Sequence, residues 1–279
     1  MPIHDQGYRR YGGRRAPRGR AWAVITTAGL RAFFGKRAFL ALLLMAWVPF
    51  LVRAVQMYAA TNLPQAAFLA PTAMTFRQFL AQQDIFVFFI TVYVGAGLIA
   101  NDRRANALQI YLSKPLSRAE YVFGKLGVLV TFLLMITWLP AIVLLVVQIA
   151  FAGNFTFFRN NLFLFPAITL YSLIEAVLGS LSMLALSSLS NNSRYVGILY
   201  AALIFFSQAL FAVLKAATGT AGWSWISMIN NLNEIGDAIF QLPIRGSAPL
   251  PMSLATIVAL AVVSGIILAK RVRGVEVVA

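Results

Sequence analysis

The stretch GLIANDRRANALQIYLSKPLSRAEYVFGK, residues 97–125, holds five Lys and Arg residues together with Asp102 and Glu120, and it lies between two long apolar runs. The chain of 279 residues is 60% hydrophobic and only 11% charged, with a mean hydropathy of +0.80. Soluble domains carry about 25% charged residues. A helix needs about 20 apolar residues to cross a hydrocarbon core of about 30 Å. The composition and the length of the apolar runs therefore predict an integral membrane protein.

The apolar runs predict an all-α membrane protein with six transmembrane helices, because the strands of a membrane barrel would be short and would alternate in polarity. The first run has no cleavage pattern after it, so we expect it to remain as an anchor. The absence of cysteine excludes disulfides and a cysteine nucleophile. The six predicted spans cover about residues 38–57, 84–100, 122–149, 162–189, 195–214 and 252–269.

The distribution of the net charge of +15 predicts the topology. Of the 23 Lys and Arg residues, nine precede the first span, five lie in residues 97–125, one is Arg194 and three follow the last span. These 18 residues fall on one side if successive spans alternate, and this positive-inside pattern places both termini in the cytoplasm. Residues 1–19 then form a basic, disordered cytoplasmic tail near acidic headgroups. Contact of this tail with RNA is the alternative, although we expect no nucleic-acid partner.

Residues 20–37, RAWAVITTAGLRAFFGKR, separate this tail from the transmembrane domain of residues 38–279. Trp22, Ile25 and Phe33 share one side at helical spacing, and Arg20 and Arg31 share another. The segment is too charged at both ends to span a membrane. It predicts an amphipathic helix lying along the cytoplasmic interface.

The quoted stretch itself predicts a helix-turn-helix between spans two and three. Asn101 or Asp102 can cap a first helix, which Pro115 ends, because the residue before a proline is pushed out of helical geometry. Ser117 and Glu120 then form an S-x-x-E capping box at the start of a second helix. An ordinary loop is the alternative, but such a loop needs only a few polar residues. A docking element explains the apolar side chains of Leu108, Tyr111 and Leu112, which would otherwise stay exposed.

The order of these parts resembles the permease subunits of ATP-binding-cassette (ABC) transporters of the type-2, exporter-type family, including NosY-like and multidrug-export permeases. The chain departs from the family at Asp102, where members have Glu, and at Asn106-Ala107, where they have Gly-Thr. The resemblance is carried by Asp102, Arg103, Arg104, Asn106, Ala107, Leu108, Leu112, Ser113, Lys114, Pro115, Leu116, Ser117, Arg118, Tyr121, Gly124 and Lys125.

The resemblance implies that the stretch is a cytoplasmic coupling helix seated in a separate ATPase subunit. It also implies two such ATPase subunits, a second permease copy or a sister permease, and the plasma membrane of a bacterium or archaeon. This chain has no G-x-x-x-x-G-K-[ST] phosphate loop, so no cofactor is expected on it, and ATP and magnesium belong to the partner. The implied coupling residues are Asp102, Arg103, Arg104, Leu108, Tyr111, Leu112, Lys114, Pro115 and Arg118.

Residues 223–242, WSWISMINNLNEIGDAIFQL, predict a second unusual helix, on the external side. Apolar side chains from Trp225 to Leu242 form one stripe, and Asn230, Glu234 and Asp237 lie elsewhere. A soluble loop is the alternative, but tryptophans suit the interface. The resembled family carries short re-entrant or interfacial helices at this place, and such a helix would shape an outer gate.

Glu175 is the residue within the spans that most needs an explanation. A carboxylate at mid-membrane costs about 3 kcal/mol, so it is protonated, paired or facing water. Ser172, Gly179 and Ser182 share its helical face, which we expect to turn toward other helices. Glu175, Ser172 and Ser182 either belong to a substrate path or form interhelical contacts, with Arg53 as a possible partner of the carboxylate. Pro49 and Pro140 are expected to kink or start helices.

Enzymatic functions are disfavoured, because the only histidine is His4 and no metal-ligand motif is present. Two function classes remain. One is a permease subunit that exports, or otherwise moves, a substrate with ATP hydrolysed by a partner. The other is a non-transporting membrane scaffold or sensor that recruits a cytoplasmic partner.

Overall fold

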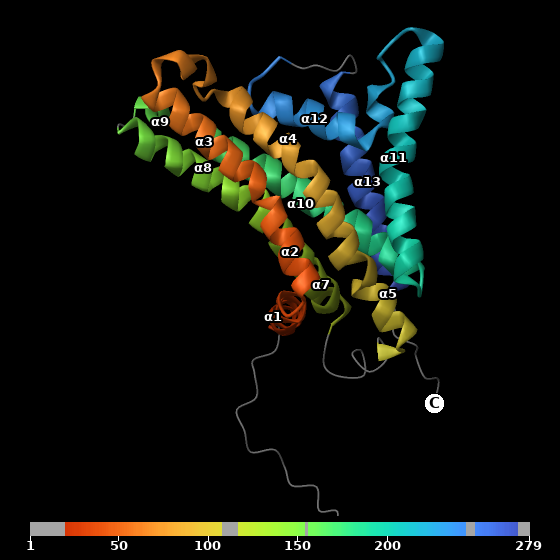
Figure 1. The fold of residues 1–279 in the computed structure, drawn as a ribbon. Helices are drawn as coiled ribbons and strands as arrows, with labels where there is room; N and C mark the ends of the chain where they lie inside the picture. Colours follow the sequence, from red (N-terminus) through yellow and green to blue (C-terminus); the bar gives the residue numbers. More distant parts are fainter. Residues whose placement is uncertain (1–19, 108–116, 154–155, 244–248, 273–279) are drawn as a thin grey trace, which may run out of the picture.

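The computed structural model describes residues 20–107, 117–153, 156–243 and 249–272, which form helices and turns with no β-strand among them (Figure 1). Six helical segments of this part are long and apolar enough to cross a membrane. The predicted all-α fold with six candidate spans is thereby confirmed. The six segments are Arg37–Asn62, Ala73–Arg104, Arg118–Ala152, Leu164–Leu189, Ser193–Thr218 and Leu250–Arg271.

The second segment starts eleven residues earlier than the sequence predicted, at Ala73 instead of residue 84. Polar residues lower the hydropathy of this first part, yet Arg77 is only 2% exposed and Gln83 is fully buried. Their side chains contact other helices instead of lipid, so the helix can be polar and still lie inside the bundle. Hydropathy alone cannot make this distinction.

Three of the six segments are broken into consecutive helices. In the first and third segments the break comes at Trp47 and Thr137, two to three residues before Pro49 and Pro140. A proline ring lacks an N–H group and clashes with the preceding turn, so it favours the first turn of a new helix. The predicted effect of these two prolines is confirmed. The pieces are α2 (Arg37–Ala46) and α3 (Val48–Asn62), then α7 (Arg118–Ile136) and α8 (Trp138–Ala152).

The second segment contains α4 (Ala73–Ile90), one stretch of π-helix, η2 (Thr91–Gly95), and α5 (Ala96–Arg104). The helix continues through Asn101 and Asp102, so the expectation that one of them caps a new helix is wrong. After Arg104 the chain turns, and Asn106 has a φ of 53°. Asparagine tolerates this left-handed conformation better than most residues.

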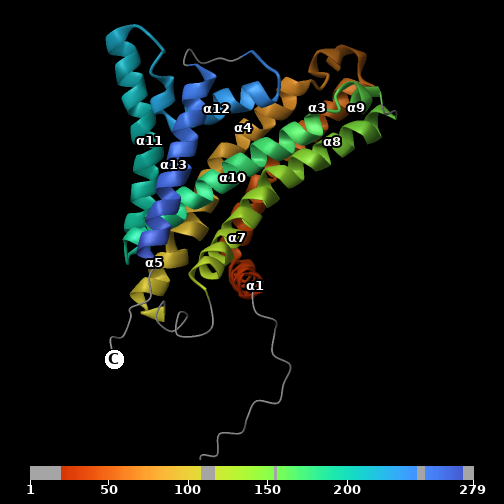
Figure 2. The ribbon, with the colours of Figure 1, turned by 180° about the vertical axis from the view of Figure 1, so that it is seen from behind.

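Helix α10 (Leu164–Leu189) runs through the middle of the molecule and packs on helices to both sides (Figure 2). Most of its side chains are buried, including Ser172, Glu175 and Ser182. The expectation that this face turns toward other helices is confirmed. The remaining elements are η1 (Pro64–Leu69), α9 (Thr156–Asn160), α11 (Ser193–Thr218), η3 (Ser224–Ile226), α12 (Met228–Ile239) and α13 (Leu250–Arg271).

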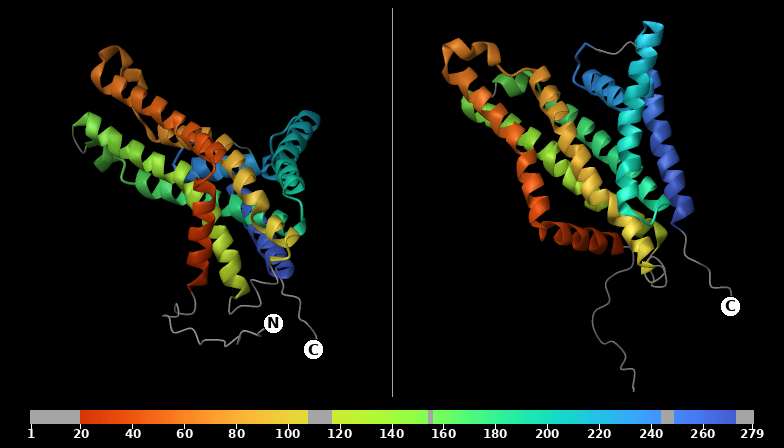
Figure 3. Two further views of the ribbon diagram at one scale, coloured as in Figure 1. Left: turned by 60° about the horizontal axis from the view of Figure 1, so that its bottom comes forward. Right: turned by 45° about the vertical axis from the view of Figure 1, so that its right-hand side comes forward.

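The helix predicted over residues 20–37 is present as α1 (Ala21–Phe34), and it lies across the end of the bundle next to α7 (Figure 3). The two helices approach closely. A Cβ at Gly124 would lie 2.7 Å from Cβ of Ile25, and Thr26 Oγ1 donates to the carbonyl of Gly124 at 3.0 Å. Small residues allow such backbone contact between helices. As a result α1 is fixed to the start of the third segment.

The two ends of the bundle differ in composition. Helix α1, the end of α5, the start of α7 and the end of α13 lie at one end, and α12 lies across the other (Figure 1). Of the 15 Lys and Arg residues in the described part of the chain, the four that lie elsewhere are Arg53, Arg77, Arg159 and Lys215. The eleven at the α1 end are Arg20, Arg31, Lys36, Arg37, Arg103, Arg104, Arg118, Lys125, Arg194, Lys270 and Arg271.

Candidate functional site

The base of the predicted helix-turn-helix is a cluster of three side chains from α5 and α7. Lys125 Nζ lies 2.7 Å from Asp102 Oδ2, and the hydroxyl of Tyr121 donates to the same oxygen at 2.8 Å. All three residues belong to the motif that carries the family resemblance. Their contacts tie the end of the second segment to the start of the third.

A capping box begins α7, the second helix of the predicted helix-turn-helix. The backbone N–H of Glu120 donates to Ser117 Oγ at 3.2 Å, and the N–H of Ser117 donates to Glu120 Oε2 at 3.0 Å. The two side chains thus satisfy backbone donors that the first helical turn leaves without partners. Arg118, the first residue of α7, is exposed.

Not all of the residues expected to couple to an ATPase belong to the described part of the chain. Arg103 and Arg104 end α5, and Arg104 is exposed. Leu108, Tyr111, Leu112, Lys114 and Pro115 lie outside the described residues. The described residues therefore provide the base of the predicted coupling element, at the end of α5 and the start of α7.

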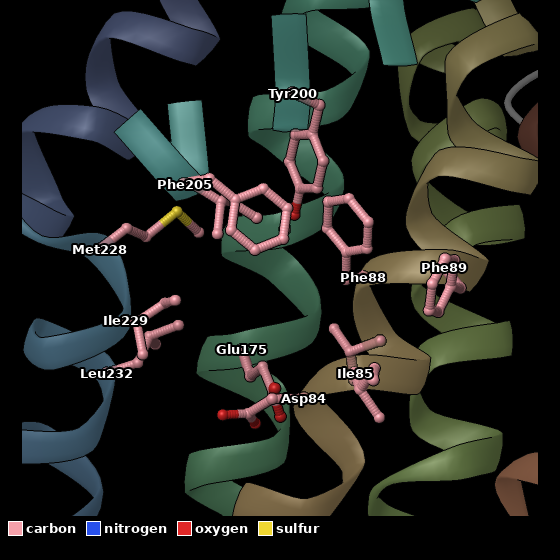
Figure 4. A pocket seen from close by; sticks show the side chains of 13 residues that line it. Asp84, Ile85, Phe88, Phe89, Glu175, Tyr200, Phe205, Met228, Ile229 and Leu232 are labelled. Carbon is pink, nitrogen blue, oxygen red and sulfur yellow. The ribbon is translucent and has the colours of Figure 1, made fainter. Parts of the chain in front are cut away.

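A second polar cluster lies within the bundle, where Glu175 of α10 faces Asp84 of α4 (Figure 4). Glu175 is 4% exposed, and its Oε2 atom has no hydrogen-bond partner among the described residues. The same holds for Asp84 Oδ1. Two carboxyl groups that face each other need a shared proton or a bound cation, since two ionised carboxylates repel. This requirement makes the pair a candidate binding site.

Arg77, seven residues before Asp84 on α4, links the pair to α12. Its Nε atom lies 3.3 Å from Asp237 Oδ1, and its Nη2 atom donates to Asn233 Oδ1 at 2.7 Å. The guanidinium also lies over the ring of Tyr171, 4.7 Å from its centroid. A Cβ at Gly236 would come within 2.5 Å of Arg77 Nε, so only glycine leaves room for this side chain beneath α12.

Two further polar contacts hold α12 against its neighbours. Glu234 is 3% exposed and accepts hydrogen bonds from Ser224 Oγ, at 2.7 Å, and from Ser253 Oγ of α13. Ser227 caps α12 by accepting from the N–H of Asn230 at 3.2 Å, and it also bonds to Gln208 of α11. Helix α11 and the start of α13 are thereby joined to α12.

Helix α12 buries polar as well as apolar side chains. Glu234 and Asp237, which the sequence placed off the apolar stripe, are buried as deeply as Met228 and Ile235 of that stripe. Buried charges are retained where they have partners, and here Arg77 and two serines provide them. Two faces of α12 therefore contact the bundle.

Glu175 also has a different neighbour from the one considered. Arg53 donates to Gln56 Oε1 at 3.2 Å and to Gln82 Oε1 at 3.4 Å, and Glu175 faces Asp84 instead. Ser182 donates to the carbonyl of Leu178, within its own helix, at 2.8 Å. Ser172 is fully buried, and its hydroxyl has no partner among the described residues.

The sequence gives little sign that Asp84, Arg77 and Asp237 belong to one site. Asp84 is the first residue of a predicted span, and Arg77 lies outside the predicted spans. The available signal was their spacing of seven residues, which places them on one helical face. Asp237 had no comparable signal, because only the tertiary structure brings α12 against α4.

Comparison with protein-family models and with curated proteins finds no match for this chain. Within the described residues there is no group of three or more His, Cys, Asp or Glu that could hold a metal ion.

Proposed function

We propose that this chain is the permease subunit of an ABC transporter of the type-2, exporter-type family. It pairs with itself or with a sister permease and with two ATPase subunits, in the plasma membrane of a bacterium or archaeon. It moves a substrate, in the direction of export, with ATP and magnesium held by the partner. Both termini and the α1 end of the bundle face the cytoplasm.

The observation that carries this proposal is the cluster of Asp102, Tyr121 and Lys125. These motif residues are separated by up to 23 positions and meet between two adjoining candidate spans. A rigid base of this kind suits an element that must transmit force, because a loose loop would absorb it. The concentration of basic residues at the same end supports its cytoplasmic orientation.

The connection from this base to the inner polar cluster supports a mechanical role. Helix α5 leads through the π-helical turn η2 into α4, which carries Asp84 and Arg77. π-Helical turns are rare and occur often at functional sites. Closure of an ATPase dimer against the base would shift α5, and η2 is the point where α4 can respond.

The test is to look for an ATPase encoded beside this chain, to co-express the two, and to co-purify them. We expect the ATPase to be retained, and we expect Leu108→Asp or Leu112→Asp to release it while leaving membrane insertion unchanged. Phe68→Asp is the matched control, because Phe68 is 83% exposed and belongs to η1 at the α12 end. A stable complex that contains another protein and no ATPase would overturn the proposal in favour of a scaffold.

A further inference from the structure

We propose that the cavity enclosed by α4, α10, α11 and α12 binds an amphipathic organic cation, with the ammonium group between Asp84 and Glu175 and the apolar body against the aromatic lining (Figure 4). The inference that the transported substrate binds in this cavity rests on the proposed transport function. The binding itself does not, and it can be measured without an ATPase.

The cavity has the size and lining of a small-molecule site. Its volume is about 360 Å³, and such sites typically measure about 300–1,000 Å³ and are mostly apolar with a few polar groups. Asp84 and Glu175 lie together among these apolar walls, and Tyr200 is the other polar lining residue. The apolar lining includes Ile85, Phe88, Phe89, Phe205, Met228 and Leu232.

The charges around the carboxyl pair do not balance. Among the described residues, Arg77 is the only cation that acts on either carboxyl group, and it already contacts Asp237 and Asn233. One guanidinium thus faces three carboxyl groups in a setting where unpaired charge is costly. Asp84 and Glu175 act as hydrogen-bond partners of each other, but Glu175 Oε2 and Asp84 Oδ1 have no partner at hydrogen-bond distance among the described residues. A ligand ammonium supplies both the positive charge and the N–H donors.

The lining selects an organic cation over a metal ion. Calcium takes six to eight oxygen ligands and magnesium six, whereas the side chains lining this cavity offer oxygen only from Asp84, Glu175 and Tyr200. Aromatic faces attract organic cations. The rings of Phe88 and Phe205 lie 5.3 Å apart by their centroids, and those of Phe88 and Tyr200 are stacked at 6.0 Å.

Side chains at the rim leave a lateral route to the cavity. Ile85, Phe89 and Phe205 are 58%, 50% and 57% exposed on the surface of the single chain. An amphipathic amine partitions into the bilayer with its apolar part among the acyl chains. It can therefore reach the carboxyl pair from the side, without crossing the buried Arg77–Asp237 contact.

Protons compete with such a ligand for the same two oxygens. The ionisable groups that act on the pair are Arg77 on α4, Tyr171 on α10 and Tyr200 on α11, and Asp237 on α12 lies behind them, in contact with Arg77. Because a protonated pair no longer needs a cation, we expect binding of an ammonium ligand to weaken as the pH falls. A neutral ligand of the same shape gains nothing from the pair at any pH.

The experiment is equilibrium dialysis of the purified chain in detergent with 1-naphthylmethylamine and with its neutral isostere 1-naphthylmethanol. We expect the amine to bind at least about tenfold more tightly than the alcohol, because the free energy of one hydrogen bond to a charged group is enough for a tenfold ratio of dissociation constants. Glu175→Gln and Asp84→Asn should each remove this preference. Glu120→Gln is the matched control, since Gln also serves in a capping box.

Equal binding of the amine and the alcohol would overturn the proposal, as would an equal loss of the preference in Glu120→Gln.

If the two cavity variants do not fold, the wild-type chain is treated with dicyclohexylcarbodiimide, which reacts with protonated carboxyl groups in apolar surroundings. We expect an adduct on Glu175 or Asp84, mapped by peptide mass, that the amine suppresses and the alcohol does not. Labelling that the amine leaves unchanged would refute the site. Loss of the ATPase complex alone would refute only the transport function.

Discussion

Two ion pairs in the described part of the chain differ in their surroundings, although each joins two helices. Lys125 and Asp102 are 2.7 Å apart with side chains 14% and 19% exposed, whereas Arg77 and Asp237 are 3.3 Å apart with side chains 2% exposed. Water can replace a lost partner at the first pair but not at the second. The first pair therefore contributes less to stability than the second, which holds α12 in place.

Removal of Arg77 should have the largest effect. We expect Arg77→Met to lower the free energy of unfolding by about 3 to 5 kcal/mol, because Asp237 is left charged and buried. Thermal unfolding in detergent measures the loss. Arg53→Met is the matched control, since Arg53 belongs to the neighbouring α3 and donates only to two glutamines.

The double variant Arg77→Met/Asp237→Leu sharpens this result. If the cost comes from an uncompensated charge, removing both partners should recover part of the stability that the single variant loses. If the double variant is no more stable than Arg77→Met, the lost stability comes from packing around Tyr171 and Gly236 and not from the uncompensated charge.

The contact between α1 and α7 should give an intermediate effect. Gly124→Ala places a Cβ 2.7 Å from Ile25, so α1 must shift, at a cost of about 1 to 3 kcal/mol. Gly265→Ala is the matched control, because this glycine is also helical and a Cβ there meets nothing within 4 Å. Equal unfolding temperatures of the two variants would contradict the close contact of α1 with α7.

Removal of Lys125 should have the smallest effect on stability. We expect Lys125→Met to cost about 1 kcal/mol or less, because the pair is partly exposed and Tyr121 still donates to Asp102. Under the proposed function, the same variant should lower the stimulation of ATP hydrolysis by more than its stability loss explains. Hydrogen exchange of residues 117–125 checks whether the base has loosened.

Much of the fold could be predicted because the responsible forces act locally. Apolar length predicted six spans, the prolines predicted two breaks, and Ser117 and Glu120 predicted the start of α7. These features depend on neighbours within one or two helical turns. The start of α4 could not be predicted in this way, because Arg77 and Gln83 look like solvent-facing residues until their partners are known.

The candidate site was predicted only in part. Glu175 stood out because a carboxylate within a span is costly, but its neighbour Asp84 did not, and Arg53 was the wrong partner to consider. Residues 102, 121 and 125 were recognised as parts of one motif, yet nothing in their spacing showed that they contact one another. Such contacts depend on how whole helices cross.

The sequence by itself determined that this chain has six segments long and apolar enough to cross a membrane, where its basic residues concentrate, and which local signals begin and break its helices. The reason is that hydropathy, proline geometry and helix capping act over short distances along the chain. Only the tertiary structure decided that α12 lies against α4 and α10 and that Asp84 meets Glu175 beside Arg77. Those contacts join residues as far apart in the chain as Arg77 and Asp237, and their energies depend on burial, which no local pattern records.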